Sequence, residues 1–374
     1  MPDFFEQVQH IWSNIKGHSA PLPALAVVPP ERCWPEGSAG ARIRRDEAYF
    51  TLRVNEMYLD LNRQWYAVYD PLVLVVTEFN HGRQRVTVPY VVGPNLIRKQ
   101  NGEQSPKHGT VVLDTRVAGP FPYRGGDVDI SIGFYQVQHA NYAKTLLSMI
   151  ERVSDLVGGA FQIGVVAKTG AALLEGVDEL LNIQGTVMLT GLRLSLATSA
   201  MDPLTTGFCA MVAPPVPQET NALIVRDRRL WIRDAGASGE IPYRASDYVL
   251  LSITGSASRD DESLGPFLDM KNDALNALWD GADGPERAKA NLITAYQQMR
   301  KSPDITASEA SVLFDTWLAE LDRELARLNQ VKTLPIDGQD AASDGTRNWG
   351  TSAEMAQDLS SALRKVDKRL NARV

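Results

Sequence analysis

The chain has 374 residues, of which 44% are hydrophobic and 22% are charged, and its formal net charge is -7. This composition is that of an ordinary globular protein and excludes a fibrous or wholly disordered chain. Because Lys and Arg are scattered and outnumbered by acidic residues, no basic surface is expected for a phosphate backbone. We therefore expect no nucleic-acid partner.

The length predicts two or three domains, and cysteine usage points to a reducing compartment. Cys33 and Cys209 are the only cysteines, too far apart in sequence for a metal knuckle and too few for a disulfide framework. The acidic N-terminus lacks the basic region of a signal peptide. The longest uncharged run, residues 203–218, is interrupted by prolines and shorter than the roughly 20 residues that span a bilayer. The sequence thus predicts a cytoplasmic protein without integral membrane insertion in its resting state.

Residues 1–45 predict a short N-terminal helix followed by a connector. Residues 3–16 carry a weakly amphipathic helical pattern, and five prolines then occur between positions 21 and 35. Each proline fixes its own φ and disfavours helix in the residue before it. We expect this stretch to run extended as far as Arg45.

Residues 46–158 have the pattern of an antiparallel β-sandwich. From Tyr49 apolar residues occupy every second position, as a strand buried on one face requires. Residues 72–79 and 85–92 flank Asn80-His81-Gly82-Arg83, which suits a hairpin turn. Residues 110–117 and 128–137 predict further strands, and residues 139–157 predict a helix that closes the domain.

Residues 159–260 predict a mixed α/β region. A helical pattern covers residues 166–181, and strand patterns follow at residues 186–197, 223–225, 230–232 and 248–253. A proline cluster near residue 215 separates the first of these strands from the others. The sequence does not predict the topology of this region.

Residues 261–334 predict a helical domain. One helix ends near Trp279, a second begins with Pro285 in its first turn, and a third begins at Thr306 with Glu309 completing a capping box. The third helix carries a narrow apolar stripe, made of Phe314, Trp317, Leu321, Leu325 and Leu328. We favour packing of this stripe inside the chain over an intermolecular coiled coil.

Residues 335–350 are polar and rich in Gly and Asp, which indicates a flexible linker, and residues 351–374 predict a terminal amphipathic helix. An isolated helix of this length is marginal in water and becomes ordered only when it docks. We expect it to contact a protein partner, although docking on its own chain or on an anionic membrane surface are alternatives. Its candidate contact residues are Met355, Leu359, Val366 and Leu370 on the apolar face, with Arg364 and Lys365 beside them.

No metal or cofactor site is expected from the histidines and cysteines. The five histidines lack the spacing that zinc ligands favour on a helix. A calcium site on the loops of the sandwich would need several carboxylates, for which Asp60, Asp70 and Asp114 are available in addition to those near residue 128.

The densest polar constellation is Asp127 and Asp129 with His139 one strand farther on. Two neighbouring carboxylates can coordinate a hard cation or serve as a catalytic acid and base. However, alternate residues of a strand face opposite sides, so Asp127 and Asp129 share the face opposite to Val128 and Ile130. We favour an ordinary half-exposed strand and keep these three residues as weak catalytic candidates.

The combined pattern predicts an α+β protein with an N-terminal β-sandwich, a mixed middle region and a helical C-terminal domain. Because neither half carries a sequence-local catalytic signature, our leading hypothesis is a non-enzymatic protein-interaction module, an adaptor or regulatory subunit. The alternatives are a hydrolase or metal-dependent enzyme using the Asp127, Asp129 and His139 cluster, and a membrane-active effector whose Gly- and Ala-rich residues 156–196 insert into a bilayer. The oligomeric state is not predicted.

Overall fold

The computed structural model describes residues 23–59, 69–82, 84–93, 96, 110–138, 150, 173, 177, 187–196, 204–213, 222–233, 239–259 and 264–332. The chain divides into two compact units, Met1–Arg259 and Asp260–Val374. The described part of the first unit consists mainly of strands, and that of the second consists of helices. The protein therefore belongs to the α+β class, as the sequence predicts.

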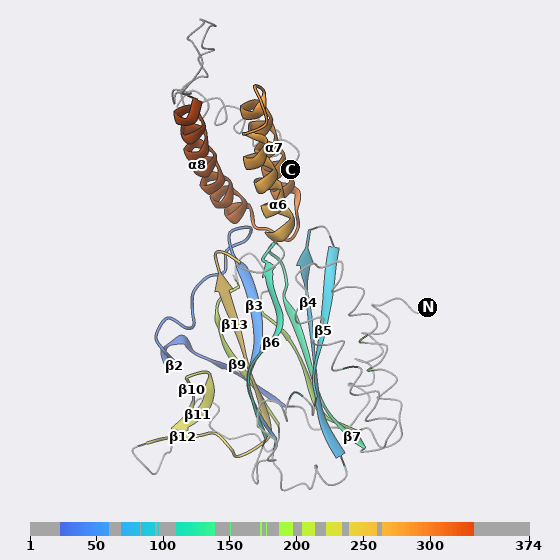
Figure 1. Cartoon of the computed structure of the whole chain (residues 1–374). Coiled ribbons are helices and arrows are strands. Elements are labelled where there is room, and N and C mark those ends of the chain that lie inside the picture. Colours follow the sequence, from blue (N-terminus) through green and yellow to red (C-terminus); the bar gives the residue numbers. More distant parts are fainter. Residues whose placement is uncertain are drawn as a thin grey trace, which may run out of the picture. The chain divides into compact units, whose positions relative to one another are not determined.

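The first unit contains a five-stranded antiparallel sheet in the order β1-β9-β13-β3-β6 (Figure 1). Its strands come from all three predicted segments before residue 260. The connector supplies one strand, the segment 46–158 supplies two, and the segment 159–260 supplies the other two. In chain order they are β1 (Ala24–Val28), β3 (Tyr49–Leu59), β6 (Thr110–Pro122), β9 (Gly207–Val212) and β13 (Tyr248–Ser256).

A second, four-stranded antiparallel sheet has the order β5-β4-β7-β8. The predicted hairpin is confirmed, because β4 and β5 pair as far as His81 opposite Gln84, and Gly82 in the turn has a φ of 60°. A left-handed φ of this kind carries little strain for glycine. The strands are β4 (Tyr69–His81), β5 (Gln84–Val92), β7 (Asp129–Gln138) and β8 (Val187–Ser195).

A third, small sheet has the order β12-β11-β10-β2. The strands β10 (Leu223–Arg226) and β11 (Arg229–Arg233), which correspond to the strand patterns predicted at residues 223–225 and 230–232, pair as an antiparallel hairpin. Asp227 and Arg228 both have positive φ, as a two-residue hairpin turn requires. The strand β2 (Cys33–Trp34), which follows the 3-10 helix η1 (Pro30–Arg32), pairs in parallel with β10, and β12 (Glu240–Pro242) pairs with β11.

Each face of the five-stranded sheet contributes to a hydrophobic core. One face and the inner face of the four-stranded sheet contribute to a single core, with Phe50, Phe79 and Phe121 in mutual ring contact. The other face is covered by the small sheet and contributes Tyr248 and Leu250 to a separate core. Because strand residues alternate between faces, β9 sends Phe208 to one core and Cys209 to the other.

The second unit contains the helices α6 (Gly265–Ala277), α7 (Gly284–Lys301) and α8 (Ala307–Lys332). The helix α7 begins with Pro285 in its first turn, and the Thr306 hydroxyl accepts a hydrogen bond of 3.1 Å from the Glu309 N–H at the start of α8. The predicted stripe of α8 is buried among residues of α6 and α7. Its assignment as core within the chain is therefore confirmed.

The two helices predicted between residues 139 and 181 are represented only by Ile150, Leu173 and Val177, which are helical and buried. The predicted helices at residues 3–16 and 351–374 and the linker at residues 335–350 lie outside the described residues. The predicted domain boundaries stay predictions. Among the described helices, none is both long enough and apolar enough to cross a membrane.

Candidate functional site

The structure separates the environments of the two candidate carboxylates. Val128, Ile130 and Ile132 face the shared core, as alternation predicts. Asp127 lies at the exposed start of this segment, whereas Asp129 is buried on the outer face of the four-stranded sheet. His139 lies outside the described residues, so its position relative to the carboxylates is not given.

Asp129 belongs to a row of charged residues that crosses all four strands of its sheet, with two carboxylates flanked by two arginines. In strand order the row contains Arg85, Glu78, Asp129 and Arg193. The Arg193 guanidinium donates to one oxygen of Glu78 and to one of Asp129, at 3.0 Å in each case, and Arg85 also donates to Asp129. Both carboxylates are buried, while the two guanidinium groups reach the surface.

The charge row favours the ionised form of Asp129. Burial raises the pKa of Asp129, but hydrogen bonds from Ser195 and Arg193 and the charges of Arg193 and Arg85 outweigh burial, so the pKa lies below its ordinary value. A catalytic acid needs the opposite shift, toward the working pH. The arrangement is therefore better described as a set of ion pairs that links neighbouring strands than as a catalytic acid and base pair.

Glu56 forms a second buried carboxylate cluster, between the five-stranded and the small sheet. Its oxygens accept hydrogen bonds from the Tyr248 hydroxyl (2.6 Å), the Arg244 guanidinium (2.8 Å) and the Leu230 backbone N–H (2.8 Å). The Arg244 guanidinium also lies over the ring of Tyr58. These contacts join β3, β11 and β13, so the cluster holds the small sheet in place.

Of the three carboxylates available for a calcium site, the structure describes the side chain of Asp114. Asp114 accepts hydrogen bonds from Arg53 at 2.7 Å and from Arg228 at 2.5 Å, and these contacts lower its pKa even though burial acts in the opposite direction. Asp60 and the side chain of Asp70 are outside the described part of the chain. Within that part, no group of His, Cys, Asp and Glu side chains could hold a metal ion.

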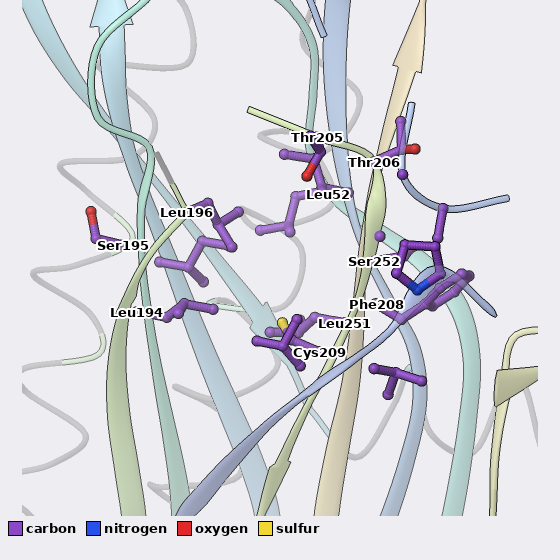
Figure 2. Close-up of a pocket in the computed structure, with 18 residues that line it drawn as sticks. Leu52, Leu194, Ser195, Leu196, Thr205, Thr206, Phe208, Cys209, Leu251 and Ser252 are labelled. Atoms are coloured by element: carbon purple, nitrogen blue, oxygen red, sulfur yellow. The ribbon is translucent and has the colours of Figure 1, made fainter. Parts of the chain in front are cut away.

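A cavity of about 330 Å³ is the best candidate for a binding site (Figure 2). Its lining residues come from β1, β3, β7, β8, β9 and β13 and from the segments near residues 39–40 and 205–206. On the inner side, toward the core shared by the two sheets, it is lined by Leu52, Leu194, Leu196, Cys209 and Leu251; on the outer side, it is lined by Val28, Pro30, Ala39, Phe208 and Ser252. This volume falls within the range of small-molecule sites.

Backbone pairing of residues 40–41 with Thr206 shapes the rim of the cavity. The Gly40 N–H donates to the Thr206 carbonyl and the Thr206 N–H donates to the Ala41 carbonyl, both at 2.8 Å. Beside the rim, β1 presents Val27, which is 68% exposed. Among the described strands, β1 pairs only with β9 and forms an edge of the sheet. An apolar lining and an apolar edge strand thus lie next to each other.

The polar groups in the cavity are not suited to covalent chemistry. Burial raises the pKa of the Cys209 thiol to about 12, which keeps it protonated at neutral pH and therefore poorly nucleophilic. Ser252 is 2% exposed, and its hydroxyl has no hydrogen-bond partner among the described residues. This oxygen is covered by protein atoms, so it is buried in the fold and offers no contact to a bound molecule.

Sequence reasoning misses these residues for identifiable reasons. Cys209 lies in a run that is apolar at successive positions because both faces of β9 are buried, so no alternation marks it as a strand. Ser252 is a single polar residue inside the apolar run of β13, which is a weak signal that could have been noticed. The six contact residues predicted on the terminal helix, Met355, Leu359, Arg364, Lys365, Val366 and Leu370, lie outside the described residues.

Comparison of the chain with known protein families, with curated proteins and with solved structures finds no match.

Proposed function

We propose that the chain is a non-enzymatic interaction module, an adaptor or regulatory subunit of a cytoplasmic complex. In this proposal the first unit is a β-sandwich platform with a mixed α/β part, and the second is a helical domain that ends in a partner-binding segment. The observation that carries the proposal is the amphipathic pattern of residues 351–374, with Met355, Leu359, Val366 and Leu370 on one face. Such a face gains free energy when it buries its apolar surface against a partner.

The state of the described polar clusters supports binding over catalysis. The buried carboxylates of Asp129 and Glu56 and the half-exposed carboxylate of Asp114 all accept hydrogen bonds from arginine side chains that cross-link strands. A guanidinium that forms an ion pair with a carboxylate favours its ionised form and occupies the oxygens that a substrate would use. These clusters therefore have a structural explanation that requires no reaction.

The protein contact is proposed on the terminal segment, residues 351–374. The other strong apolar stripe of the helical unit, on α8, is already buried in the core of that unit. The remaining amphipathic pattern in this part of the sequence is the face with Met355, Leu359, Val366 and Leu370. Arg364 and Lys365 would add an electrostatic preference for an acidic partner surface.

The test is affinity capture of partners by the full chain and by a chain ending at Leu334. We expect a protein that binds the full chain in stoichiometric amount and is lost on truncation. The double variant Leu359→Asp and Val366→Asp, which places charges on the apolar face, should also lose that protein. The matched control Gln357→Asp and Ser361→Asp adds the same two charges at polar positions and should retain it.

Reconstitution with the purified partner then measures affinity directly. If the full chain and the truncated chain both elute alone, or if the apolar-face variant binds as well as its control, the proposed contact is wrong.

A further inference from the structure

One side of α6 is apolar and remains exposed to solvent. Leu268 and Leu275 lie two helical turns apart on this side, and Trp279 follows one turn later, in the turn that closes the helix. We call these three residues the α6 face. Trp279 is 49% exposed and Leu268 is 42% exposed, while Leu275 is partly buried at the edge of the helical core. Exposed apolar side chains that adjoin one another on a helix indicate a surface that another element can cover.

Acidic side chains border the α6 face. Asp269 and Asp273, one helical turn apart, are both exposed on the same flank of α6. Neither carboxylate has an ion-pair partner among the described residues. Lys271, the basic residue of α6, is already paired with Glu320 of α8 at 2.7 Å. The α6 face therefore favours an occupant whose apolar surface is bordered by basic side chains.

The end of α8 lies close to the α6 face. Short turns join α6 to α7 and α7 to α8, so each helix reverses the direction of the one before it, and α6 and α8 run the same way (Figure 1). The ion pair between Lys271 and Glu320 fixes their alignment. At about 1.5 Å per residue from that pair, Trp279 lies about 12 Å and Lys332 about 18 Å farther along. The last residue of α8 is therefore about one helical turn beyond Trp279.

The chain after Lys332 is long enough to reach this surface. The predicted linker, residues 333–350, would span roughly 20 to 25 Å as a random coil. That span exceeds the sum of one helical turn and the roughly 8 to 10 Å that separate packed helices. A tether of this length gives an effective concentration of about 1 mM, so a contact with a dissociation constant of about 0.1 mM would be docked about ten times as often as not.

Residues 351–374 have the pattern that the α6 face favours. Leu359 and Val366 are part of the apolar face predicted for this segment. Lys365 and Arg369, four residues apart, border one edge of that face when the segment is helical. Residues 359–374 carry five basic residues and one acidic residue. The segment thus combines an apolar face with a basic edge, which is complementary to the apolar α6 face and its acidic flank.

We propose that residues 351–374 dock on the α6 face of their own chain, with their apolar side chains against Trp279 and Leu268 and their basic edge beside Asp269 and Asp273. The inference rests on the proposed function where it concerns regulation, because the docked segment hides the apolar face that contacts a partner. A partner then competes with the α6 face for the same segment. The chain shields its own binding segment until a partner is present.

The first test is cross-linking of the purified full chain with a carbodiimide, which joins a carboxylate to a lysine amine as an amide while the reagent takes up the water released. Chains of natural isotope content are mixed with chains labelled with a heavy nitrogen isotope before the reaction. We expect mass spectrometry to find Lys365 or Lys368 joined to Asp269 or Asp273 within chains of one isotope. Absence of these links overturns the inference. Links that are as frequent between the two isotopes as within one also overturn it, because the occupant is then a second copy.

Hydrogen exchange of the full chain measures docking independently of cross-linking. The backbone amides of residues 351–374 should exchange about tenfold faster in Trp279→Lys than in the unsubstituted chain, because the substitution removes apolar area and repels the basic edge. The matched control is Val312→Lys, which makes the same change at a side chain of α8 that is 61% exposed, and it should keep the protection. If thermal unfolding shows that Trp279→Lys does not fold, Leu268→Lys takes its place. Equal exchange in the substituted and unsubstituted chains overturns the inference.

Partner capture separates this inference from the proposed function. If capture yields no partner while the cross-link forms, the proposed function is wrong and the docking stands. If a partner is captured through residues 351–374 but neither the cross-link nor the protection is found, the docking is wrong and the proposed function stands. Where both hold, Trp279→Lys should raise the apparent affinity for the partner about tenfold, because the docked state no longer competes.

Discussion

A carboxylate that accepts hydrogen bonds from two arginines keeps its negative charge at acidities that protonate an exposed aspartate. Asp129 is in this position, between Arg85 and Arg193. Asp127, two residues earlier, is exposed. Burial raises the pKa of Tyr123, and the charge of Asp127 raises it further. The pair offers a direct comparison of a structural and a surface carboxylate within one short segment.

We predict that Asp129→Asn lowers the free energy of unfolding at pH 7 by about 1 to 2 kcal/mol, because the buried carboxylate loses its ion pairs with two arginines. The loss is limited to this size because both arginines are partly solvated. The folded-state pKa of Asp129 is depressed. Its contribution is therefore complete above the unfolded pKa of about 3.9 and is lost as the pH falls through the folded value. Urea unfolding at pH 7 and pH 3 measures the difference in unfolding free energy between Asp129→Asn and the unsubstituted chain. This difference should be smaller at pH 3.

Asp127→Asn is the control for this prediction. It should change the free energy of unfolding by less than about 0.5 kcal/mol at either pH, as is usual for an exposed substitution. Equal destabilisation by the two substitutions would show that the charge row does not stabilise the fold.

The Glu56 carboxylate is fully buried and accepts three hydrogen bonds. Removing its charge should therefore destabilise the fold even when the side chain keeps its size. Glu56→Gln keeps the size but removes the counter-charge of Arg244, and we predict a loss of about 2 kcal/mol. The partial exposure of Arg244 moderates that loss. Chemical denaturation measures this loss of unfolding free energy. Glu47→Gln, at an exposed ion pair with Arg44, should have an effect near zero; a comparable loss there would argue against the burial explanation.

At the scale of the element, the start of α8 depends on one side chain. The Thr306 hydroxyl accepts a hydrogen bond from the backbone N–H of Glu309 in the first turn of the helix. We predict that Thr306→Ala lowers the free energy of unfolding of the helical unit by about 1 kcal/mol. Circular dichroism during urea unfolding provides the measurement.

Thr316→Ala is the matched control within the same helix. Thr316 is exposed, and its hydroxyl donates to the Val312 carbonyl one turn earlier, a contact that competes with helix geometry. Alanine at this position should be neutral or slightly stabilising. A loss as large as that at Thr306 would mean that the cap is not the cause.

Elements buried on one face could be predicted from the sequence, while those buried on both faces or paired through short segments could not. The alternation from Tyr49 and the hairpin at Gly82 identify β3, β4 and β5 because each has one apolar face. The strand β9 was not predicted because Phe208 and Cys209 enter different cores, and its neighbours are prolines. The strand β1 was not predicted because it lies among prolines and is only five residues long.

The cavity could not be predicted for a related reason. Its walls come from β1, β8, β9 and β13, which are separated in sequence and meet only through the strand order of two sheets. No local pattern indicates that Gly207 lies opposite a gap, since a glycine at the start of a strand is ordinary. The exposed edge at Val27 likewise depends on which strand ends the sheet.

At the scale of the whole molecule, the five-stranded sheet is the element on which the first unit depends. It has a core on each face, and its strands come from residues 24–28, 49–59, 110–122, 207–212 and 248–256. Such interleaving requires pairing between residues far apart in sequence, which makes folding slow relative to a helical unit with local contacts. The helical unit has its own core, contributed by α6, α7 and α8.

Because each unit has its own core, we predict that the full chain unfolds in two calorimetric transitions. Leu321→Ala removes a fully buried side chain from the helical core and should cost about 2 to 5 kcal/mol. For a domain of this size that corresponds to a fall of about 10 °C or more in the midpoint of the helical transition. Asp129→Asn should lower only the midpoint of the transition of the first unit. If either substitution shifts both midpoints equally, the units unfold as one cooperative body, and the stability of the cavity in the first unit would then depend on the helical unit as well.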